Sequence, residues 1–268
     1  MHFSIFLHVI GLLVNTINVP FDRGANLQGS KRAPEVINKH LNFLNINQNF
    51  TVVSKNNHIA NILADTYINV WNTLNCNIFP LVIGGDHTIS AGSVSASNDY
   101  CISNKEKLGV LWLDAHADFN TIETSPSGNL HGVPVSILCG HTLPFISFGN
   151  NMDCCQFAYY GLRDLDSLEF ERFQKYNMKI VDNNDEICDW VKNFDKIYIS
   201  LDLDVLDPIE FNFTNTPIPN GITLEKLYSA LEIIKGSNKL LGIDIVEYNP
   251  DKGEDTTVIN DIIKLVIA

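Results

Sequence analysis

The chain has 268 residues and a hydrophobic content of 45%, which is enough to bury one sizeable core. Its formal net charge is −13 and it contains no basic run, which argues against a nucleic-acid partner because phosphate binding needs clustered lysine and arginine. We therefore expect a single domain over residues 1–268 that acts on a small molecule. The six cysteines lack CxxC spacing, which favours reduced cytosolic thiols over a disulfide framework, and adjacent Cys154 and Cys155 are interpreted as packing residues.

The first expected element lies near the amino terminus, where "FSIFLHVIGLLV" forms an apolar stretch. No Lys or Arg precedes it and no small-residue cleavage site follows it, so we favour a strand with an apolar lead-in over a secretory signal peptide. Residues 1–14 are then an apolar N-terminal extension, and we expect a cytoplasmic protein. The stretch is too short to span a bilayer and no other segment qualifies, so we expect no membrane partner.

Farther along the chain, short apolar runs alternate with segments of helical period, a pattern typical of an α/β fold with a mostly parallel sheet and helices on both faces. The expected strands cover residues 78–85, 108–116, 157–162, 178–182, 196–204 and 239–247. The expected helices cover residues 34–44, 59–74, 168–176, 224–235 and 256–266. Thr223 is expected to cap the fourth of these helices, and the asparagine-rich stretch "LNFLNINQNF" is interpreted as a connection.

Three of the expected strands end in clusters of acidic residues and histidines. The clusters are Asp86 and His87 in "IGGDH", Asp114, His116 and Asp118 in "DAHAD", and Asp202, Asp204 and Asp207 in "DLDVLDP". In an open α/β sheet, ligands bind beyond the carboxyl ends of the strands. The three clusters can therefore converge on one crevice although they lie far apart in the sequence.

The "DAHAD" cluster carries the most information. Its residues at alternate positions of an extended chain point to the same side, where buried acids and imidazoles repel or stay unpaired unless a cation neutralises them. By contrast, "GGDH" alone is also explained by a glycine turn with an ordinary histidine. A turn at Asp207 and Pro208 explains the end of "DLDVLDP" but leaves Asp202 and Asp204 unexplained.

Taken together, the clusters supply two histidines and several aspartates. This oxygen-rich set suits manganese or a similar divalent ion better than a structural zinc, which would draw on cysteine. Because the ligands outnumber the needs of one ion, the sequence indicates a binuclear site that activates a water molecule.

Five separated motifs carry a resemblance to a known family. In order and approximate spacing, "GGDHT", "DAHADFNT", "SGNLHGVPVS", "SLDLDVLDP" and "GIDIVEYNP" resemble the ureohydrolase superfamily, and "SGNLHG" resembles arginases in particular. The resemblance runs from "VPFDRGANLQGSKRAP" to the final helix. It implies a three-layer αβα sandwich of the arginase/deacetylase kind.

The activity that the resemblance implies is the hydrolysis of L-arginine to L-ornithine and urea. It implies two Mn²⁺ ions per subunit, with a metal-bridging hydroxide attacking the guanidinium carbon. It also implies a homo-oligomer, either a trimer or a hexamer, and a part in arginine metabolism such as the urea cycle.

The resemblance further implies roles for individual residues of this sequence. One manganese ion would be held by His87, Asp114, Asp118 and Asp202, and the other by Asp114, His116, Asp202 and Asp204. The catalytic residues would be Asp118, which orients the hydroxide, His131, which protonates the departing amine, and Glu247, which binds the guanidinium. The other substrate contacts would be Asn120, Ser127 and Asn129 around the α-carboxylate, Asp166 near the α-ammonium, and Gly132 and Thr216 elsewhere in the pocket. Without the resemblance, His131 reads as a histidine at a helix start and Glu247 as a surface carboxylate.

The sequence departs from the family pattern in three places. The stretch 139–157 is shorter than in longer arginases, Asn220-Gly221 replaces the usual double glycine, and the chain stops at Ala268 without the tail that some arginases use in trimers. The first two departures are expected to affect loops near the pocket.

Three alternatives to an arginase remain open. A ureohydrolase acting on another guanidino substrate, such as an agmatinase, would keep the metal ligands and change the pocket. A non-catalytic binding protein on this fold would be expected to lose ligands. A metal-dependent deacetylase of related architecture would use a single zinc ion with fewer ligands.

Overall fold

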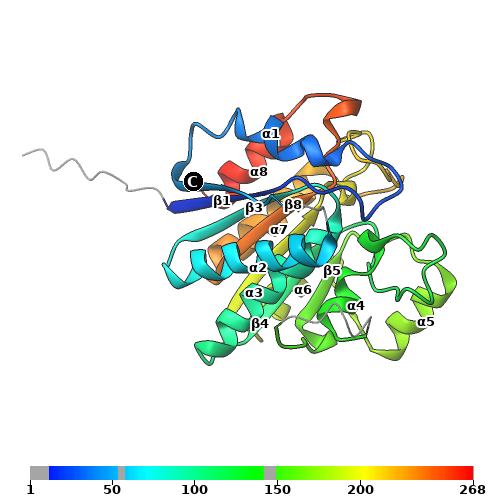
Figure 1. The fold of residues 1–268 in the computed structure, drawn as a ribbon. Helices are drawn as coiled ribbons and strands as arrows, with labels where there is room; N and C mark the ends of the chain where they lie inside the picture. Colours follow the sequence, from blue (N-terminus) through cyan, green and yellow to red (C-terminus); the bar gives the residue numbers. More distant parts are fainter. Residues whose placement is uncertain (1–11, 54–57, 142–148, 268) are drawn as a thin grey trace, which may run out of the picture.

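Eight parallel strands form a single sheet in a computed structural model that describes residues 12–53, 58–141 and 149–267. The strand order is β2-β1-β3-β8-β7-β4-β5-β6. Figure 1 shows β1, β3 and β8 side by side in this order. The strands are β1 (Leu13–Val19), β2 (Asn45–Thr51), β3 (Phe79–Gly84), β4 (Leu108–Leu113), β5 (Phe157–Tyr160), β6 (Lys179–Ile180), β7 (Lys196–Asp202) and β8 (Leu240–Val246).

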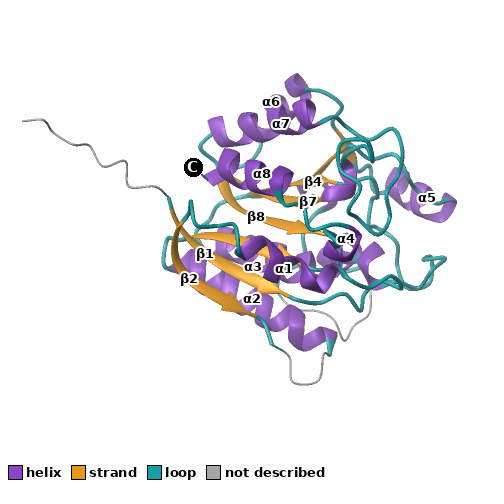
Figure 2. Ribbon diagram, turned by 90° about the horizontal axis from the view of Figure 1, so that it is seen from above, coloured by secondary structure: helices purple, strands orange, loops and turns teal. Residues whose placement is uncertain are grey.

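Helices cover both faces of this sheet, which confirms the predicted three-layer αβα class. The helices are α1 (Ala33–Asn38), α2 (Ile59–Asn75), α3 (Ser90–Ser103), α4 (Pro134–Leu138), α5 (Ser167–Lys175), α6 (Asn184–Val191), α7 (Leu224–Gly236) and α8 (Thr257–Ile267). Helices α6, α7 and α8 lie on one side of the strands, and α2 and α3 on the other (Figure 2). None of the helices in the described residues combines the length and apolar character needed to cross a membrane.

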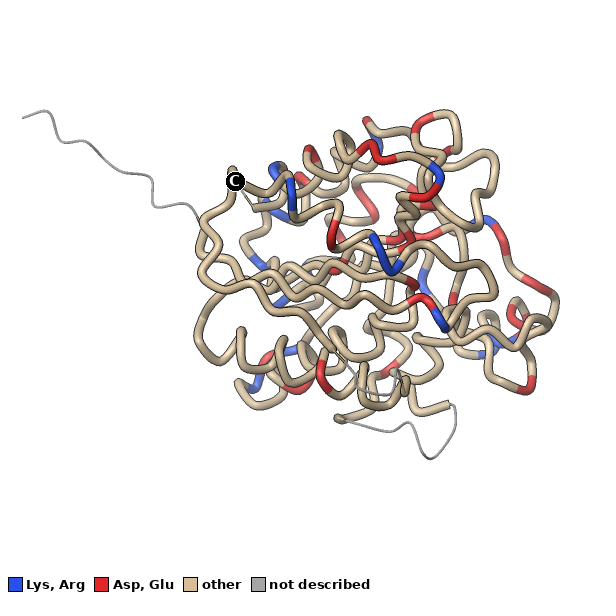
Figure 3. The backbone as a smooth tube through the Cα atoms, turned by 45° about the horizontal axis from the view of Figure 1, so that its top comes forward, with Lys and Arg blue, Asp and Glu red and all other residues tan. Residues whose placement is uncertain are grey.

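The central strands are buried on both faces. Every residue of β3 ("FPLVIG") and β4 ("LGVLWL") is buried, which is why these strands read as continuous apolar runs rather than as alternating patterns. Lysine and arginine positions are dispersed over many elements of the fold (Figure 3).

Most of the predicted elements are confirmed. All six expected strands are present, and helices α2, α5, α7 and α8 agree with the predicted ranges to within one residue at each end. Oγ1 of Thr223 accepts a hydrogen bond from the Lys226 amide at 3.3 Å, as expected for the cap of α7. Strand β1 begins at Leu13, whereas the apolar lead-in before Leu12 lies outside the described residues.

The segment that follows β1 was predicted wrongly in two respects. The expected helix 34–44 ends at Asn38, and the asparagine-rich stretch contains β2 instead of only a connection. Strand β2 is an edge strand that pairs only with β1, so it needs little apolar surface. Its polar side chains bond across the pair, as when Nδ2 of Asn47 donates to Oδ1 of Asn15 at 3.0 Å.

Three helices, α3, α4 and α6, were not predicted. Helix α3 is buried on nearly all sides and therefore lacks an amphipathic period. Its small residues allow close packing, since a Cβ at Gly92 would lie 2.7 Å from the carbonyl oxygen of Leu63 in α2. Two of its buried serines bond in different ways: Oγ of Ser97 donates to the Ser93 carbonyl at 2.9 Å, and Oγ of Ser93 donates to Oδ2 of Asp244 in β8 at 2.6 Å.

Candidate metal and active site

The four central strands β3, β8, β7 and β4 are neighbours in the sheet, and each ends in a polar segment. Because the strands are parallel, the segments after them meet at one edge. The sheet order therefore brings together "GGDH" after β3, "DAHAD" after β4, "DLD" at the end of β7 and Glu247 after β8. The three clusters converge as predicted, but Asp86 and Asp207 do not join the group of ligands: the Asp86 carboxylate accepts from the Gly24 amide and the Asp207 carboxylate from the Gly221 amide.

One group of possible metal ligands surrounds His87. Its Nδ1 lies 3.0 Å from Oδ2 of Asp114, 3.1 Å from Oδ2 of Asp118 and 3.3 Å from Oδ2 of Asp202. All four side chains are buried. His87, Asp114 and Asp118 offer ligand atoms close enough together to hold one metal ion.

A second group shares Asp114 with the first. Nδ1 of His116 lies 3.3 Å from Oδ1 of Asp114 and 3.3 Å from Oδ2 of Asp204, and these three residues also satisfy the spacing of a metal site. The two oxygens of Asp114 thus face two different imidazoles. Asp114 therefore belongs to both groups of possible metal ligands.

The donor atoms of the first group fit a cation because they lack other partners. Nδ1 of His87 and Oδ2 of Asp118 are buried atoms without a hydrogen-bond partner among the described residues. Buried polar atoms are rarely left in this state. A divalent ion that prefers carboxylate and imidazole ligands would satisfy both atoms.

The pKa values of the clustered carboxylates also favour a bound cation. Burial, together with the charges of Asp204 and Asp114, raises the pKa of Asp202 well above its ordinary value. Burial and the charge of Asp114 raise the pKa of Asp118 to about 6. Burial alone would lower the pKa of His87, but the three surrounding carboxylates raise it overall. A bound cation would let these carboxylates stay ionised.

A hydrogen-bond relay behind His87 selects the tautomer that a metal needs. Oγ of Ser200 donates to Oδ1 of Asp244 at 2.7 Å, so the 2.9 Å contact between Ser200 and Nε2 of His87 places the proton on Nε2. Nδ1 then carries no proton, and its lone pair faces the carboxylates. Such a relay orients a ligating imidazole and increases its basicity.

Trp112 is a further supporting residue. Its ring stacks on His87, with centroids 4.3 Å apart and planes 8° apart, and its Nε1 donates to Oδ2 of Asp114 at 3.0 Å. Ser200, Asp244 and Trp112 were not predicted from the sequence as site residues. Two of them could have been found, because Ser200 in β7 and Asp244 in β8 are polar residues placed between apolar residues of a buried strand.

His131 and Glu247 form a second unit beside the metal ligands. Nδ1 of His131 lies 3.1 Å from Oε1 of Glu247, and the same oxygen accepts a hydrogen bond from the His87 amide at 2.9 Å. Glu247 is 1% exposed, which excludes the alternative of an ordinary surface carboxylate. Burial opposes the charged form of His131, but Glu247 outweighs burial and raises the pKa of His131 to about 9.

Two acidic residues of the site adopt strained backbone conformations. Asp118 has φ of 50° and Glu247 has φ of 65°, in the left-handed region that non-glycine residues rarely occupy. Such strain persists only where surrounding contacts hold it, and it is concentrated at functional sites. Here it directs both carboxylates toward the cluster, where Asp118 meets His87 and Glu247 meets His131.

A cavity of about 350 Å³ opens beside the cluster. All six of the predicted substrate contacts other than Glu247 line it, namely Asn120, Ser127, Asn129, Gly132, Asp166 and Thr216. Its described lining also includes His116, Asp118, His131 and Asp202, and it contains carboxylates but no lysine or arginine. The cavity therefore favours a cationic ligand.

Hydrogen bonds connect the cavity wall to the cluster. Nδ2 of Asn120 donates to Oδ2 of Asp166 at 2.8 Å, and Oγ1 of Thr216 donates to Oδ2 of Asp204 at 3.0 Å. His87, Asp114, Asp204 and Glu247 do not line the cavity, but each contacts a residue that does.

The two expected loop departures have different outcomes. Asn220 has φ of 63°, a left-handed conformation that asparagine adopts readily, and Gly221 remains where a Cβ would lie 2.3 Å from the Asp207 amide nitrogen. Asn220 thus adopts a glycine-like backbone in this loop. Residues 142–148 of the short stretch 139–157 lie outside the described residues.

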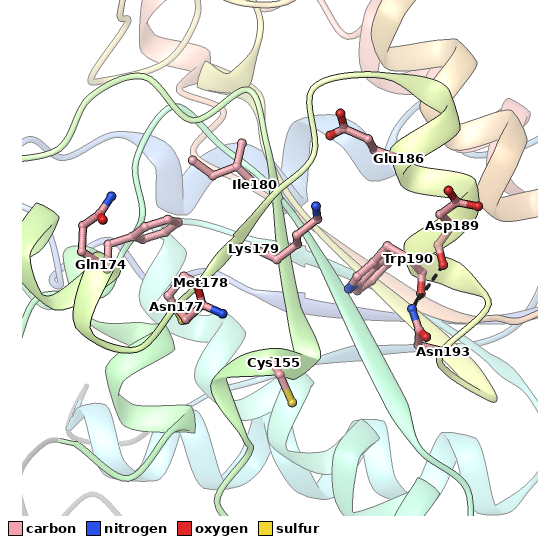
Figure 4. A pocket seen from close by; sticks show the side chains of 11 residues that line it. Cys155, Gln174, Asn177, Met178, Lys179, Ile180, Glu186, Asp189, Trp190 and Asn193 are labelled. Atoms are coloured by element: carbon pink, nitrogen blue, oxygen red, sulfur yellow. Dashed lines mark hydrogen bonds between the residues drawn. The ribbon is translucent and has the colours of Figure 1, made fainter.

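A larger cavity, of about 650 Å³, lies beside β6, the last strand in the order of the sheet (Figure 4). Its lining includes Cys155, Lys179 and Trp190, and it contains none of the predicted site residues. Size alone therefore does not identify the functional site. The combination of histidines and carboxylates does.

Comparisons with known proteins agree with this architecture. A sequence model described as "Arginase family" matches residues 14–266. An arginase of Staphylococcus aureus is 37% identical over 190 residues, which cover 65% of this chain and 61% of that protein. The matched segment thus spans less than two thirds of that relative's length.

Solved structures show the same fold over almost the whole chain. The crystal structure of arginase from Bacillus subtilis has a TM-score of 0.86 at 25% identity, covering 95% of this chain and 98% of that one. The crystal structure of Entamoeba histolytica arginase in complex with L-ornithine has a TM-score of 0.84 at 27% identity, covering 95% and 96%. From its sequence, its sheet and the matched family model, this chain belongs to the arginase family.

Proposed function

We propose that the protein is an arginase, which hydrolyses L-arginine to L-ornithine and urea and uses two Mn²⁺ ions per subunit. The observation that carries the proposal is the pair of imidazole–carboxylate groups that share Asp114 beside an acidic cavity. Family membership supports the reaction class, and a structural relative is an arginase that holds L-ornithine.

The ligand assignment follows the two groups. His87, Asp114, Asp118 and Asp202 would hold one ion, and Asp114, His116, Asp202 and Asp204 the other. When bound, the ions supply the Lewis acidity that makes water a nucleophile near neutral pH. The protein's part is to fix the ligands, which the Ser200–Asp244 relay and the Trp112 stack do for His87 and Asp114.

Residues in and beside the cavity would bind the guanidinium group of arginine at one end of the substrate and its α-carboxylate and α-ammonium groups at the other. Glu247 does not line the cavity itself but contacts His131 in its wall. Its buried Oε2 has no hydrogen-bond partner among the described residues, and we assign it to a guanidinium N–H. Asn120, Ser127 and Asn129 would contact the α-carboxylate, with Gly132 and Thr216 completing the wall. Asp166, held by Asn120, would face the α-ammonium.

His131 is assigned the proton transfer to the departing amine. Contact with Glu247 keeps its imidazole protonated at neutral pH, and its ring lines the cavity. An imidazolium in this position can give its proton to the amine nitrogen as the carbon–nitrogen bond breaks. Glu247 holds the ring in place and maintains its charge.

The direct test of the function is urea release from three guanidines: L-arginine, agmatine and guanidinobutyrate. The manganese-loaded protein should release urea from arginine far faster than from the other two, and a chelator should abolish the reaction. Asn120→Ala should raise the KM for arginine by about 10-fold or more, because a hydrogen bond to a charged group is lost. Asn75→Ala, at an exposed site ending α2, is the control. Faster turnover of agmatine would overturn the assignment of the α-carboxylate contacts.

Manganese should also stabilise the fold. An ion that binds only the native state adds about 2.7 kcal/mol at a concentration 100 times its Kd. Asp114→Asn should remove most of the resulting rise in Tm because it takes ligands from both groups. Asp189→Asn, which changes an exposed carboxylate on α6, should leave the rise intact. Thermal unfolding with and without Mn²⁺ measures both, and an equal rise in the two variants would contradict the ligand assignment.

The pH dependence of turnover should report the His131–Glu247 pair. His131 must carry a proton to act, so kcat should fall as pH rises through its pKa, which Glu247 holds at about 9. Glu247→Gln removes the negative charge, so the alkaline limb should move to lower pH by about one to two units. A pH–kcat profile of both forms tests this. If the alkaline limb of the profile does not move in Glu247→Gln, His131 is not the group that transfers the proton.

A further inference from the structure

Two cysteine thiols are in contact outside the candidate site. Sγ of Cys154 lies 3.6 Å from Sγ of Cys139, and both thiols are free. Cys139 is buried at the C-terminal end of α4, and the partly buried Cys154 opens a short 3-10 helix that precedes β5. Both pack against one apolar cluster that includes Tyr159 and Phe173.

The next residue, Cys155, has different surroundings. It is exposed and lines the cavity beside β6 together with Met178 and Trp190 (Figure 4). Adjacent cysteines thus differ in environment, one in contact with a second thiol and the other facing an open cavity. Cys155 is therefore a matched internal control for the reactivity of the pair.

We propose that Cys139 and Cys154 form a reversible disulfide when the protein meets a low-molecular-weight disulfide such as oxidised glutathione. The sulfur atoms already touch, and a disulfide requires them to approach to about 2.05 Å. Cys154 is only partly buried and packs against the apolar cluster from its edge, so its side chain is less confined than that of Cys139. This disulfide can form whether or not metal ions are bound and whether or not the protein has the proposed activity.

The chemistry is two successive thiol–disulfide exchanges. The Cys154 thiolate attacks one sulfur of oxidised glutathione, which forms a mixed disulfide and releases one glutathione thiolate, protonated by water. The Cys139 thiolate then attacks Sγ of Cys154, forms the protein disulfide and releases the second glutathione. Two protein thiols lose two electrons and two protons, and one glutathione disulfide becomes two thiols.

The surroundings of the two thiols indicate which reacts first. Contact with Cys139 lowers the pKa of Cys154, whereas contact with Cys154 and burial raise the pKa of Cys139. Cys154 is also the more accessible of the two. A thiolate that is accessible and readily formed is the attacking group, and the buried thiol resolves the mixed disulfide.

The disulfide would tie the end of α4 to the segment that leads into β5. Helix α4 in turn holds the loop that carries Asp118, because the Val135 amide donates to the Asp118 carbonyl at 3.1 Å. Oγ of Ser136 donates to the Phe119 carbonyl at 2.8 Å. Oxidation should therefore slow hydrogen exchange at the backbone amides of α4.

The test is disulfide mapping of the full-length protein after incubation with oxidised glutathione. Remaining thiols are alkylated before digestion and mass spectrometry. A peptide linking Cys139 to Cys154 should appear, and dithiothreitol should remove it. Cys155→Ser should form the same link. Cys139→Ser should stop at a glutathione adduct on Cys154, because no resolving thiol is present.

Two outcomes would overturn the proposal. One is a stable glutathione adduct on Cys154 of the unaltered protein, and the other is a link that involves Cys155 in place of Cys139. The unaltered chain decides both, so the test does not depend on how well the variants fold. The readout is a covalent mass, so a failure of the arginase assignment would leave it unaffected.

Discussion

The structure depends on gathering carboxylates in a buried place where their charges oppose one another. Asp114, Asp118, Asp202 and Asp204 are each at most 6% exposed, and they surround only two imidazoles. Buried like charges are costly unless a cation compensates them. The parallel order of β3, β8, β7 and β4 forces this meeting, because each strand delivers its polar segment to the same edge.

The polypeptide around the cluster is adapted to hold that arrangement. A Cβ at Gly85 would lie 1.9 Å from the carbonyl oxygen of Phe21, so only glycine allows the turn after β3 to pass so close to the end of β1. The Gly85 carbonyl accepts from the Glu247 amide at 2.7 Å, which helps to hold the left-handed backbone of Glu247. The backbone conformation of Glu247, the tautomer of His87 and the charges of the carboxylates are therefore all fixed by contacts within the same small group of residues.

The sequence predicted those parts of the fold that have a regular pattern or a chemical signature. Apolar runs located the central strands, and the alternate spacing in "DAHAD" indicated ligands at a strand end. Helix α3 could not be found because burial on nearly all sides removes the polar face, and β2 could not because an edge strand tolerates asparagines. The bond of Ser200 to Asp244 and the stacking of Trp112 on His87 join residues far apart in the sequence, which residue spacing does not reveal.

Counting bound manganese tests whether two ion sites share Asp114. The protein is dialysed to equilibrium against Mn²⁺, and metal and protein are then quantified by elemental analysis. We expect two ions per chain, and one ion per chain in His116→Asn, which alters only the second group. One ion per chain in the unaltered protein, or an unchanged count in the variant, would contradict this expectation.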